Sequence, residues 1–218
     1  MGNNILFICG MLNQTTQMHS IANELPEHNC YFTPYYLEGF TTVLHQLGLM
    51  ENTAVGRKIS RKVNRYLIEQ HLTVDPRGKR DDYDLVVMCT DLLVQSNLRD
   101  KRLLLVQEGM TEPEGIRYAG VRMFGLPRYI ANTASFGLSN VYHRFCVASE
   151  GYRDLFIRKG IPREKLVVTG IPNFDNVAAF RNNDFPYHDF VLAASSPTRE
   201  TFQRDDRWNF IKRVVEIA

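Results

Sequence analysis

Two carboxylates stand directly after apolar runs that are typical of buried strands. Asp91 follows the run 84–90, and Glu108 follows the run 103–107, at the start of a loop that contains Gly109. Ligands of open parallel sheets bind beyond the carboxyl ends of the strands, and a carboxylate there can accept a proton from a substrate hydroxyl. We therefore predict Asp91 and Glu108 as catalytic bases and Gly109 as part of the substrate-binding loop. The alternatives are a helix N-cap for Asp91 and a solvated acidic loop around Glu108.

The first apolar run, 4–9, leads into a loop with one glycine and two amides. Gly10, Asn13 and Gln14 stand between that run and a predicted helix, where unpaired backbone N–H groups can hold an anion or a sugar hydroxyl. Because Gly10 stands alone, the loop does not have the GxGxxG pattern of a dinucleotide site. We predict that Gly10, Asn13 and Gln14 bind substrate. The alternative is an ordinary turn in which Asn13, Thr15 or Thr16 caps the helix.

Polar side chains also follow the apolar run 190–194. Ser196, Thr198 and Arg199 precede a predicted helix, and hydroxyls, a guanidinium and loop amides in that position suit a phosphate. The sequence therefore predicts a nucleotide- or phosphate-binding site at these three residues.

A basic stretch lies at 57–65, with five Lys or Arg in nine positions. On a helix it forms a charged face opposite Ile59, Val63 and Tyr66. Such a face can contact the phosphates of a lipid-linked acceptor or a membrane surface, or it can simply be solvated. Both interpretations stay open on the sequence.

The chain alternates short apolar runs with amphipathic stretches, which predicts βαβ units and a Rossmann-like parallel sheet flanked by helices, an α/β fold. Pro34 places the second strand at an edge or a bend. The expected strands are 4–9, 30–37, 84–90, 103–107, 143–148 and 165–169, and the expected helices are 14–25, 40–50, 56–72, 127–138 and 150–159.

The pattern restarts after a polar stretch, which predicts two domains. The first spans 1–173, a connector spans 174–189, and 190–218 begins a second domain with a strand at 190–194 and a helix at 205–217. One βα unit cannot cover both faces of a strand, so we expect this second domain to be truncated.

Composition excludes several classes of protein. A net charge of +2 argues against bulk attraction to nucleic acid, and no window reaches the roughly 18 apolar residues of a membrane span. The four cysteines lack disulfide or metal-ligand spacing and are expected to be free thiols in a reducing cytoplasm. We expect a cytoplasmic protein with no metal and no cofactor. If residues 57–65 bind lipid, we expect it to associate peripherally with the inner face of the membrane.

Two segments carry a family resemblance. Residues 146–175, with Gly170, Pro172 and Asp175 after the last strand, resemble the end of the amino-terminal domain of GT-B nucleotide-sugar enzymes. Residues 5–25 are similar in layout to the first βα unit of that fold. They also resemble the opening of UDP-GlcNAc 2-epimerases. Residues 107–109 and 197–201 resemble two later segments of that family, although the histidines of both segments are absent here.

The GT-B resemblance implies the amino-terminal, acceptor-side part of a glycosyltransferase. Such an enzyme would move a sugar from a nucleotide-sugar donor, expected to be UDP-linked, to a sugar or lipid-linked acceptor in surface polysaccharide or glycoconjugate synthesis. The donor would bind mainly to the second domain, so this chain alone is expected to be incomplete and inactive. The alternatives are a UDP-GlcNAc 2-epimerase-like enzyme and a non-catalytic sugar- or partner-binding domain.

Overall fold

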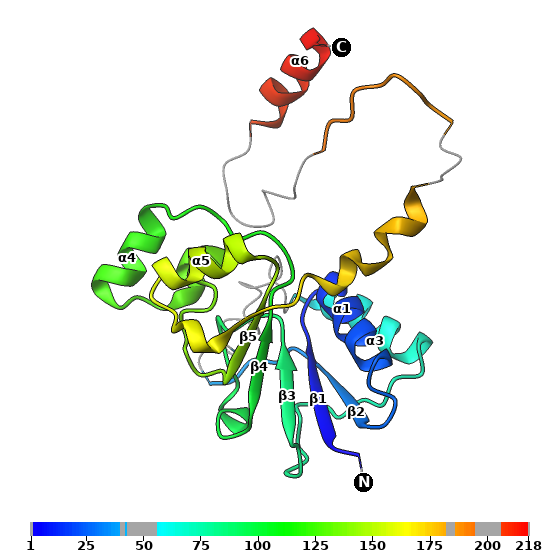
Figure 1. Ribbon diagram of the computed structural model, residues 1–218, viewed down its shortest axis with the longest axis vertical. Coiled ribbons are helices and arrows are strands. Elements are labelled where there is room, and N and C mark those ends of the chain that lie inside the picture. Colours follow the sequence, from blue (N-terminus) through cyan, green and yellow to red (C-terminus); the bar gives the residue numbers. More distant parts are fainter. Residues whose placement is uncertain (1, 40–41, 43–55, 182–185, 195–205, 218) are drawn as a thin grey trace.

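A computed structural model describes residues 2–39, 42, 56–181, 186–194 and 206–217. Its core is a six-stranded, wholly parallel sheet in the order β2-β1-β3-β4-β5-β6 (Figure 1). The predicted Rossmann-like α/β fold is therefore confirmed, and β2, the strand that ends at Pro34, lies at an edge as predicted. The strands are β1 (Asn4–Cys9), β2 (Asn29–Pro34), β3 (Leu85–Met88), β4 (Leu103–Val106), β5 (Arg144–Val147) and β6 (Leu166–Val168).

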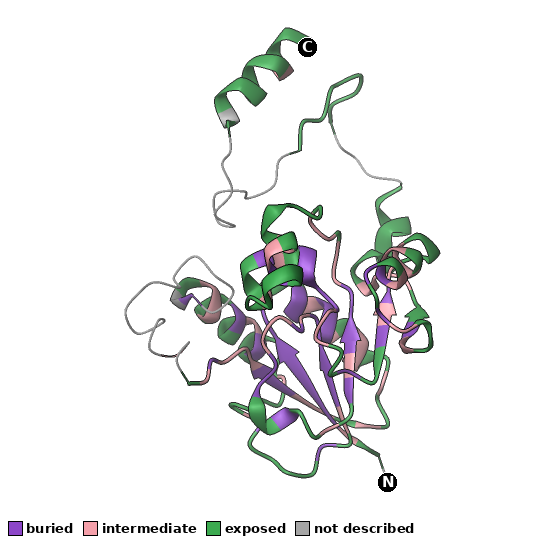
Figure 2. Ribbon diagram, turned by 90° about the vertical axis from the view of Figure 1, so that its left-hand side faces the viewer, coloured by how far each residue is buried: buried purple, intermediate pink, exposed green. Residues whose placement is uncertain are grey.

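Helices cover both faces of this sheet. Alternate residues of β1 enter two separate hydrophobic clusters: Ile5 and Phe7 pack with Met18 on one face, and Leu6 packs with the cluster of Phe156 on the other. This is the pattern of strands buried on both sides, and the strands form the buried interior in Figure 2. The helices are α1 (Leu12–Asn23), α3 (Arg57–Glu69), α4 (Ile116–Phe124), α5 (Glu150–Arg158) and α6 (Arg207–Ile217), with 3₁₀ helices η1 (Ser96–Leu98), η2 (Arg128–Ser135), η3 (Arg163–Lys165) and η4 (Pro172–Phe180).

The strand order reverses at β1. The chain leaves β1 for the edge strand β2 and then returns to pair β3 on the other side of β1. Ligands of open α/β sheets bind at such a switch point, outside the carboxyl ends of the strands. That edge is the upper one in Figure 1, where α1 begins.

The two edges of the sheet differ. Beyond β2, Phe32 donates its N–H to the carbonyl of Thr73 (2.8 Å) and accepts from the N–H of Asp75 (2.9 Å), so a short run of the chain covers that edge. The opposite edge is β6, three residues long, with Val167 and Val168 exposed.

Two expected elements differ from the structure, and one helix of the structure was not expected. The predicted helix 127–138 is the 3₁₀ helix η2, interrupted at Asn132, whose φ of 52° is left-handed and incompatible with a continuous helix. Residues 190–194, predicted as a strand, are exposed and form neither helix nor strand. The sequence also failed to predict α4. The predicted helix 40–50 lies almost entirely outside the described residues.

After β6 the chain forms η4 beside α1 and then α6, which confirms the predicted carboxy-terminal helix. Figure 1 shows α6 standing apart from the sheet, and Figure 2 shows it almost wholly exposed. The division into a first domain, a connector and a second domain stays a prediction.

Candidate functional site

The start of α1 is organised by Gln14 rather than by the expected caps. Met11 is the N-cap residue, and its N–H donates to Oε1 of Gln14 at 3.1 Å. The hydroxyl of Thr15 instead donates to the carbonyl of Met11, so the alternative in which Asn13, Thr15 or Thr16 caps the helix is wrong. A Cβ on Gly10 would lie 1.7 Å from Oε1 of Gln14. Glycine at position 10 therefore makes room for the buried Gln14 amide.

Glu108 accepts hydrogen bonds from two side-chain amides in the first turn of α1. Nε2 of Gln14 donates to Oε2 of Glu108 at 2.7 Å, and Nδ2 of Asn13 donates to Oε1. Glu108 is half-buried. The structure thus brings together three residues predicted from two separate loops, after β1 and after β4, at the carboxyl edge of the sheet.

A buried glutamine that sequence analysis missed fixes the backbone on either side of Glu108. Nε2 of Gln107 donates to the carbonyl of Gly109 (2.8 Å), and its Oε1 accepts from the N–H of Ala148 (2.9 Å). Its own carbonyl accepts from Nε2 of Gln17 in α1 (3.0 Å). Gln107 therefore ties the loop after β4 to the loop after β5 and to α1. The signal was available, because a glutamine closing an apolar strand needs buried partners.

Two further positions border this arrangement. Gly109 is half-buried, and a Cβ on it would meet nothing within 4 Å, so space is open beside Glu108. From η4, Nδ2 of Asn173 donates to the carbonyl of Asn13 at 3.1 Å. The end of the predicted first domain therefore contacts the first turn of α1. We call Asn13, Gln14, Glu108 and Gly109 the Glu108 site.

Asp91 occupies a different environment. Its side chain is fully buried, Oδ1 accepts from the N–H of Gly137 (2.8 Å), and Oδ2 accepts from the N–H of Ser139 (2.9 Å). The alternative of an N-cap is wrong, because the next helix, η1, has Gln95 as its N-cap residue. The carboxylate holds the loop after η2 in place and is not exposed at the sheet edge. A catalytic role for Asp91 stays a prediction, and this geometry favours a structural one.

The thiols near the site are poor nucleophiles. All four cysteines are free; Cys9 and Cys89 are buried and Cys30 and Cys146 are half-buried. Burial raises the pKa of Cys9 to about 12. Burial, together with the charge of Glu108, holds the pKa of Cys89 well above its usual range. Both side chains pack in the core. Because the thiolate is the reactive form, the raised pKa values make both thiols poor nucleophiles.

The remaining predicted sites lie elsewhere. Ser196, Thr198 and Arg199 fall outside the described residues. In α3, Val63 and Leu67 are buried against the sheet, while Lys58, Arg61, Lys62 and Arg65 are exposed; membrane contact through 57–65 stays a prediction. Across the described part of the chain, we find no group of three His, Cys, Asp or Glu that could hold a metal ion, and no helix long and apolar enough to cross a bilayer.

No protein-family model and no curated protein matches this chain. Among solved structures it is similar to Anabaena Alr3699/HepE in complex with UDP-glucose, with 14% sequence identity and a TM-score of 0.37. The match covers 77% of this chain and 43% of the Anabaena chain, so the present chain spans less than half the length of that protein.

Proposed function

We propose that the chain is the acceptor-side part of a GT-B glycosyltransferase. It would take a sugar from a UDP-linked nucleotide sugar to a hydroxyl of a sugar or lipid-linked acceptor, in the synthesis of surface polysaccharide or glycoconjugate. The observation that carries the proposal is the placement of Glu108, a half-buried carboxylate at the carboxyl edge of the sheet with an amide donor on each oxygen.

Glu108 would act as the general base. As the acceptor oxygen attacks the anomeric carbon, its proton passes to Glu108, and the nucleoside diphosphate leaves with the electrons of the broken glycosidic bond. The amides of Asn13 and Gln14 would hold the carboxylate in one orientation, which keeps the base aligned with an incoming hydroxyl. The open space at Gly109 would admit that hydroxyl.

The donor would be held by residues that follow this domain. In the proposal, the hydroxyls of Ser196 and Thr198 and the guanidinium of Arg199 contact the diphosphate and stabilise the charge that develops on it. Soaking the protein with UDP, GDP and CDP in turn identifies the base that it prefers.

The test is a Glu108→Gln substitution in the protein as its natural gene encodes it. The assay measures UDP release from UDP-sugars with a panel of hydroxyl acceptors. Loss of a general base costs roughly 10²–10⁴ in rate, and we expect kcat to fall by about that factor. Glu112→Gln is the matched control, a carboxylate four residues further along the same loop, and should keep the rate. Transfer that survives in Glu108→Gln would refute the assignment.

The two alternatives give different results in the same experiment. An epimerase-like enzyme would convert UDP-GlcNAc to ManNAc or UDP-ManNAc with no acceptor present. A binding domain would retain sugar ligands while neither releasing UDP nor transferring sugar.

A further inference from the structure

A groove lies between the loop after β2, the turn at 75–79 and the start of η1, and none of its lining residues belongs to the Glu108 site. Its volume is about 390 Å³, and its lining includes Tyr36, Glu38, Arg77, Lys79, Ser96 and Asn97. A volume at the lower end of the usual range for ligand pockets suits a molecule of monosaccharide size.

Asn97 holds two walls of this groove together. Its Nδ2 donates to the carbonyls of Arg77 (3.1 Å) and Gly78 (3.0 Å), and its Oδ1 accepts from the hydroxyl of Tyr36 at 2.5 Å. Burial raises the pKa of Tyr36 to about 12, so the phenol keeps the proton that it donates. Every polar atom of the Asn97 side chain is thus used to hold the groove open in one shape.

The turn that carries the two cations is also tightly specified. Arg77 and Gly78 both have left-handed backbone, with φ of 69° and 56°, and a Cβ on Gly78 would meet Cδ2 of Leu6 at 2.7 Å. The N–H of Arg77 donates to the hydroxyl of the fully buried Thr33 (2.9 Å). A left-handed arginine costs of order 1 kcal/mol, and this cost is borne at the residue whose guanidinium lines the groove.

The cations of the groove lack carboxylate partners. In the described ranges no Asp or Glu oxygen lies within 4.0 Å of the charged nitrogens of Arg77 or Lys79, whereas the neighbouring Arg80 is paired with Asp82 at 2.8 Å. The Arg77 guanidinium lies over the ring of Tyr36, 5.7 Å from its centroid, and reaches one carbonyl, that of Leu37, at 3.4 Å. Most of its five donors therefore have no acceptor among the residues that the structure describes.

Two carboxylates near this pair are hydrogen-bonded to other groups. Oε2 of Glu38 accepts from the N–H of Ser96 (2.8 Å), and Oδ2 of Asp75 accepts from the hydroxyl of Tyr83 (2.5 Å) and the N–H of Arg80 (3.1 Å). The groove therefore presents two cations, an aromatic ring and one carboxylate already engaged by backbone. An anionic group flanked by hydroxyls matches this set, with the anion on the cations.

We propose that this groove binds a sugar-sized anion, with its phosphate or carboxylate held between Arg77 and Lys79. The proposal is independent of the glycosyltransferase proposal, because it uses none of the residues of the Glu108 site.

The test is a binding titration followed by amide chemical shifts, with glucose 6-phosphate, glucuronate, inorganic phosphate and neutral glucose as probes. We expect glucose 6-phosphate or glucuronate to give saturable shifts at Tyr36, Lys79 and Ser96, and glucose to give none there. Binding by one of the two sugar anions identifies the anionic group. Inorganic phosphate should bind more weakly than glucose 6-phosphate, since it lacks the sugar.

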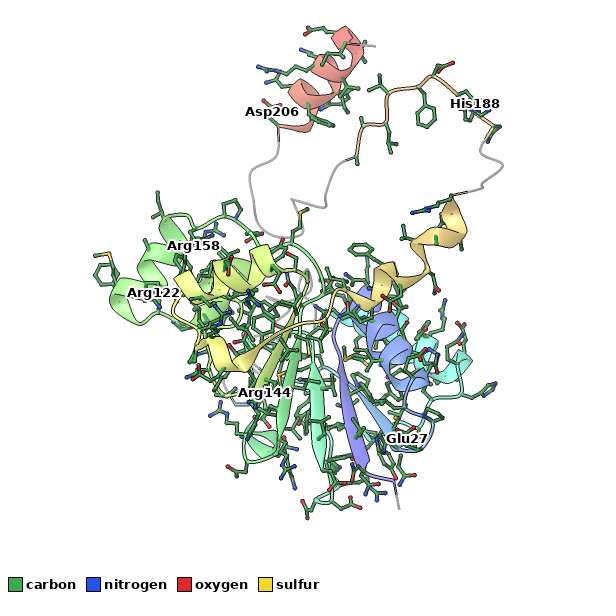
Figure 3. All side chains as sticks on the ribbon, viewed as in Figure 1. Glu27, Arg122, Arg144, Arg158, His188 and Asp206 are labelled. Carbon is green, nitrogen blue, oxygen red and sulfur yellow. The ribbon has the colours of Figure 1, made fainter. Side chains whose placement is uncertain are left out.

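Two charge-removing variants and one control complete the test. Lys79→Gln and Arg77→Gln should each weaken binding about tenfold or more, since a charge-assisted contact is lost. Arg144→Gln removes an exposed arginine at the far end of β5, labelled in Figure 3, and should change nothing. The Lys79 ammonium has no hydrogen-bond partner among the described residues, so we expect Lys79→Gln to keep the fold. This variant therefore tests the proposal even if Arg77→Gln unfolds.

Three results would overturn the proposal. The first is an absence of saturable shifts at these residues up to about 20 mM ligand, well above the millimolar Kd expected of a weak site. The second is binding of neutral glucose as tight as that of the sugar anions, or binding of inorganic phosphate as tight as that of glucose 6-phosphate. The third is unchanged affinity in Lys79→Gln.

Discussion

Replacing Gly10 by alanine should destabilise the protein because the added methyl group would clash with the side chain of Gln14. Gly10 does not have left-handed backbone, so at an unobstructed position the substitution would stabilise by about 0.4–1 kcal/mol through the unfolded state. Here the added Cβ would lie 1.7 Å from Oε1 and 2.9 Å from Cδ of Gln14. The flexible Gln14 side chain can move aside, but it then loses its hydrogen bonds.

The size of the effect follows from those bonds. The Met11 N–H bond to Oε1 is neutral, worth about 1 kcal/mol, and the Nε2 bond to the Glu108 carboxylate is charge-assisted, worth about 1.5–3 kcal/mol. After subtracting the alanine gain, Gly10→Ala should lower the free energy of unfolding by about 2 kcal/mol. For a domain of this size that is a fall in Tm of roughly 4–8 °C.

A double-mutant cycle with Gln14→Ala isolates the mechanism. The three heavy atoms nearest to the added Cβ all belong to Gln14, so removing that side chain clears the space. In the Gln14→Ala background, Gly10→Ala should therefore become neutral or slightly stabilising. Urea unfolding followed by circular dichroism gives the four free energies. An equal cost of Gly10→Ala in both backgrounds would refute the reasoning.

Three further predictions concern polar groups that are buried or half-buried. Asp91→Asn should cost about 2–4 kcal/mol in urea unfolding, because an amide nitrogen cannot accept from Gly137 or Ser139 and a buried N–H loses its partner; exposed Asp100→Asn is the control, and equal stability of the two variants would contradict the anchoring role. Burial lowers the pKa of His19, so its contribution to stability is present above pH of about 6.5 and is lost as the pH falls through the folded-state pKa. When the urea midpoint is measured as a function of pH, His19→Gln should reduce its fall toward acid pH. His188→Gln should leave that fall unchanged; His188 lies on the exposed segment and is labelled in Figure 3. In native protein Cys9 and Cys89 should stay unreactive to dithionitrobenzoate at pH 8, with all four thiols reacting in denaturant; rapid labelling of four native thiols would disprove their burial.

The parts of the fold that sequence reasoning predicted are those in which burial dominates. The apolar run at 4–9 could only be a strand covered on both faces, and its residues do alternate between two hydrophobic clusters. Pro34 cannot donate to a second neighbour, and β2 is an edge strand. In each case a local property of the residues decides the outcome.

The misses have tertiary causes. Helix α4 contains Gly120 and follows Gly115, and its only buried residue is Val121, so it has little apolar periodicity to detect. At 190–194 the apolar composition is right for a strand, but composition does not provide a pairing partner.

The site was predicted in part for the same reason. Strand ends in a parallel sheet share one edge, which was enough to expect Asn13, Gln14 and Glu108 near one another. The burial of Asp91 depends on a loop 46 residues away in sequence, and the bonds of Gln107 depend on Gln17 and Ala148. No spacing rule in the sequence contains those partners.

The unequal edges of the sheet bear on self-association at high protein concentration. Exposed strand edges can serve as templates on which a second chain adds a strand. At β2 the backbone groups of Phe32 already bond to Thr73 and Asp75, so a foreign strand finds them occupied. β6 is only three residues long. It therefore offers few backbone groups with which a second chain could form hydrogen bonds. The shortness of β6 therefore limits edge-to-edge growth at the edge where Val167 and Val168 are exposed.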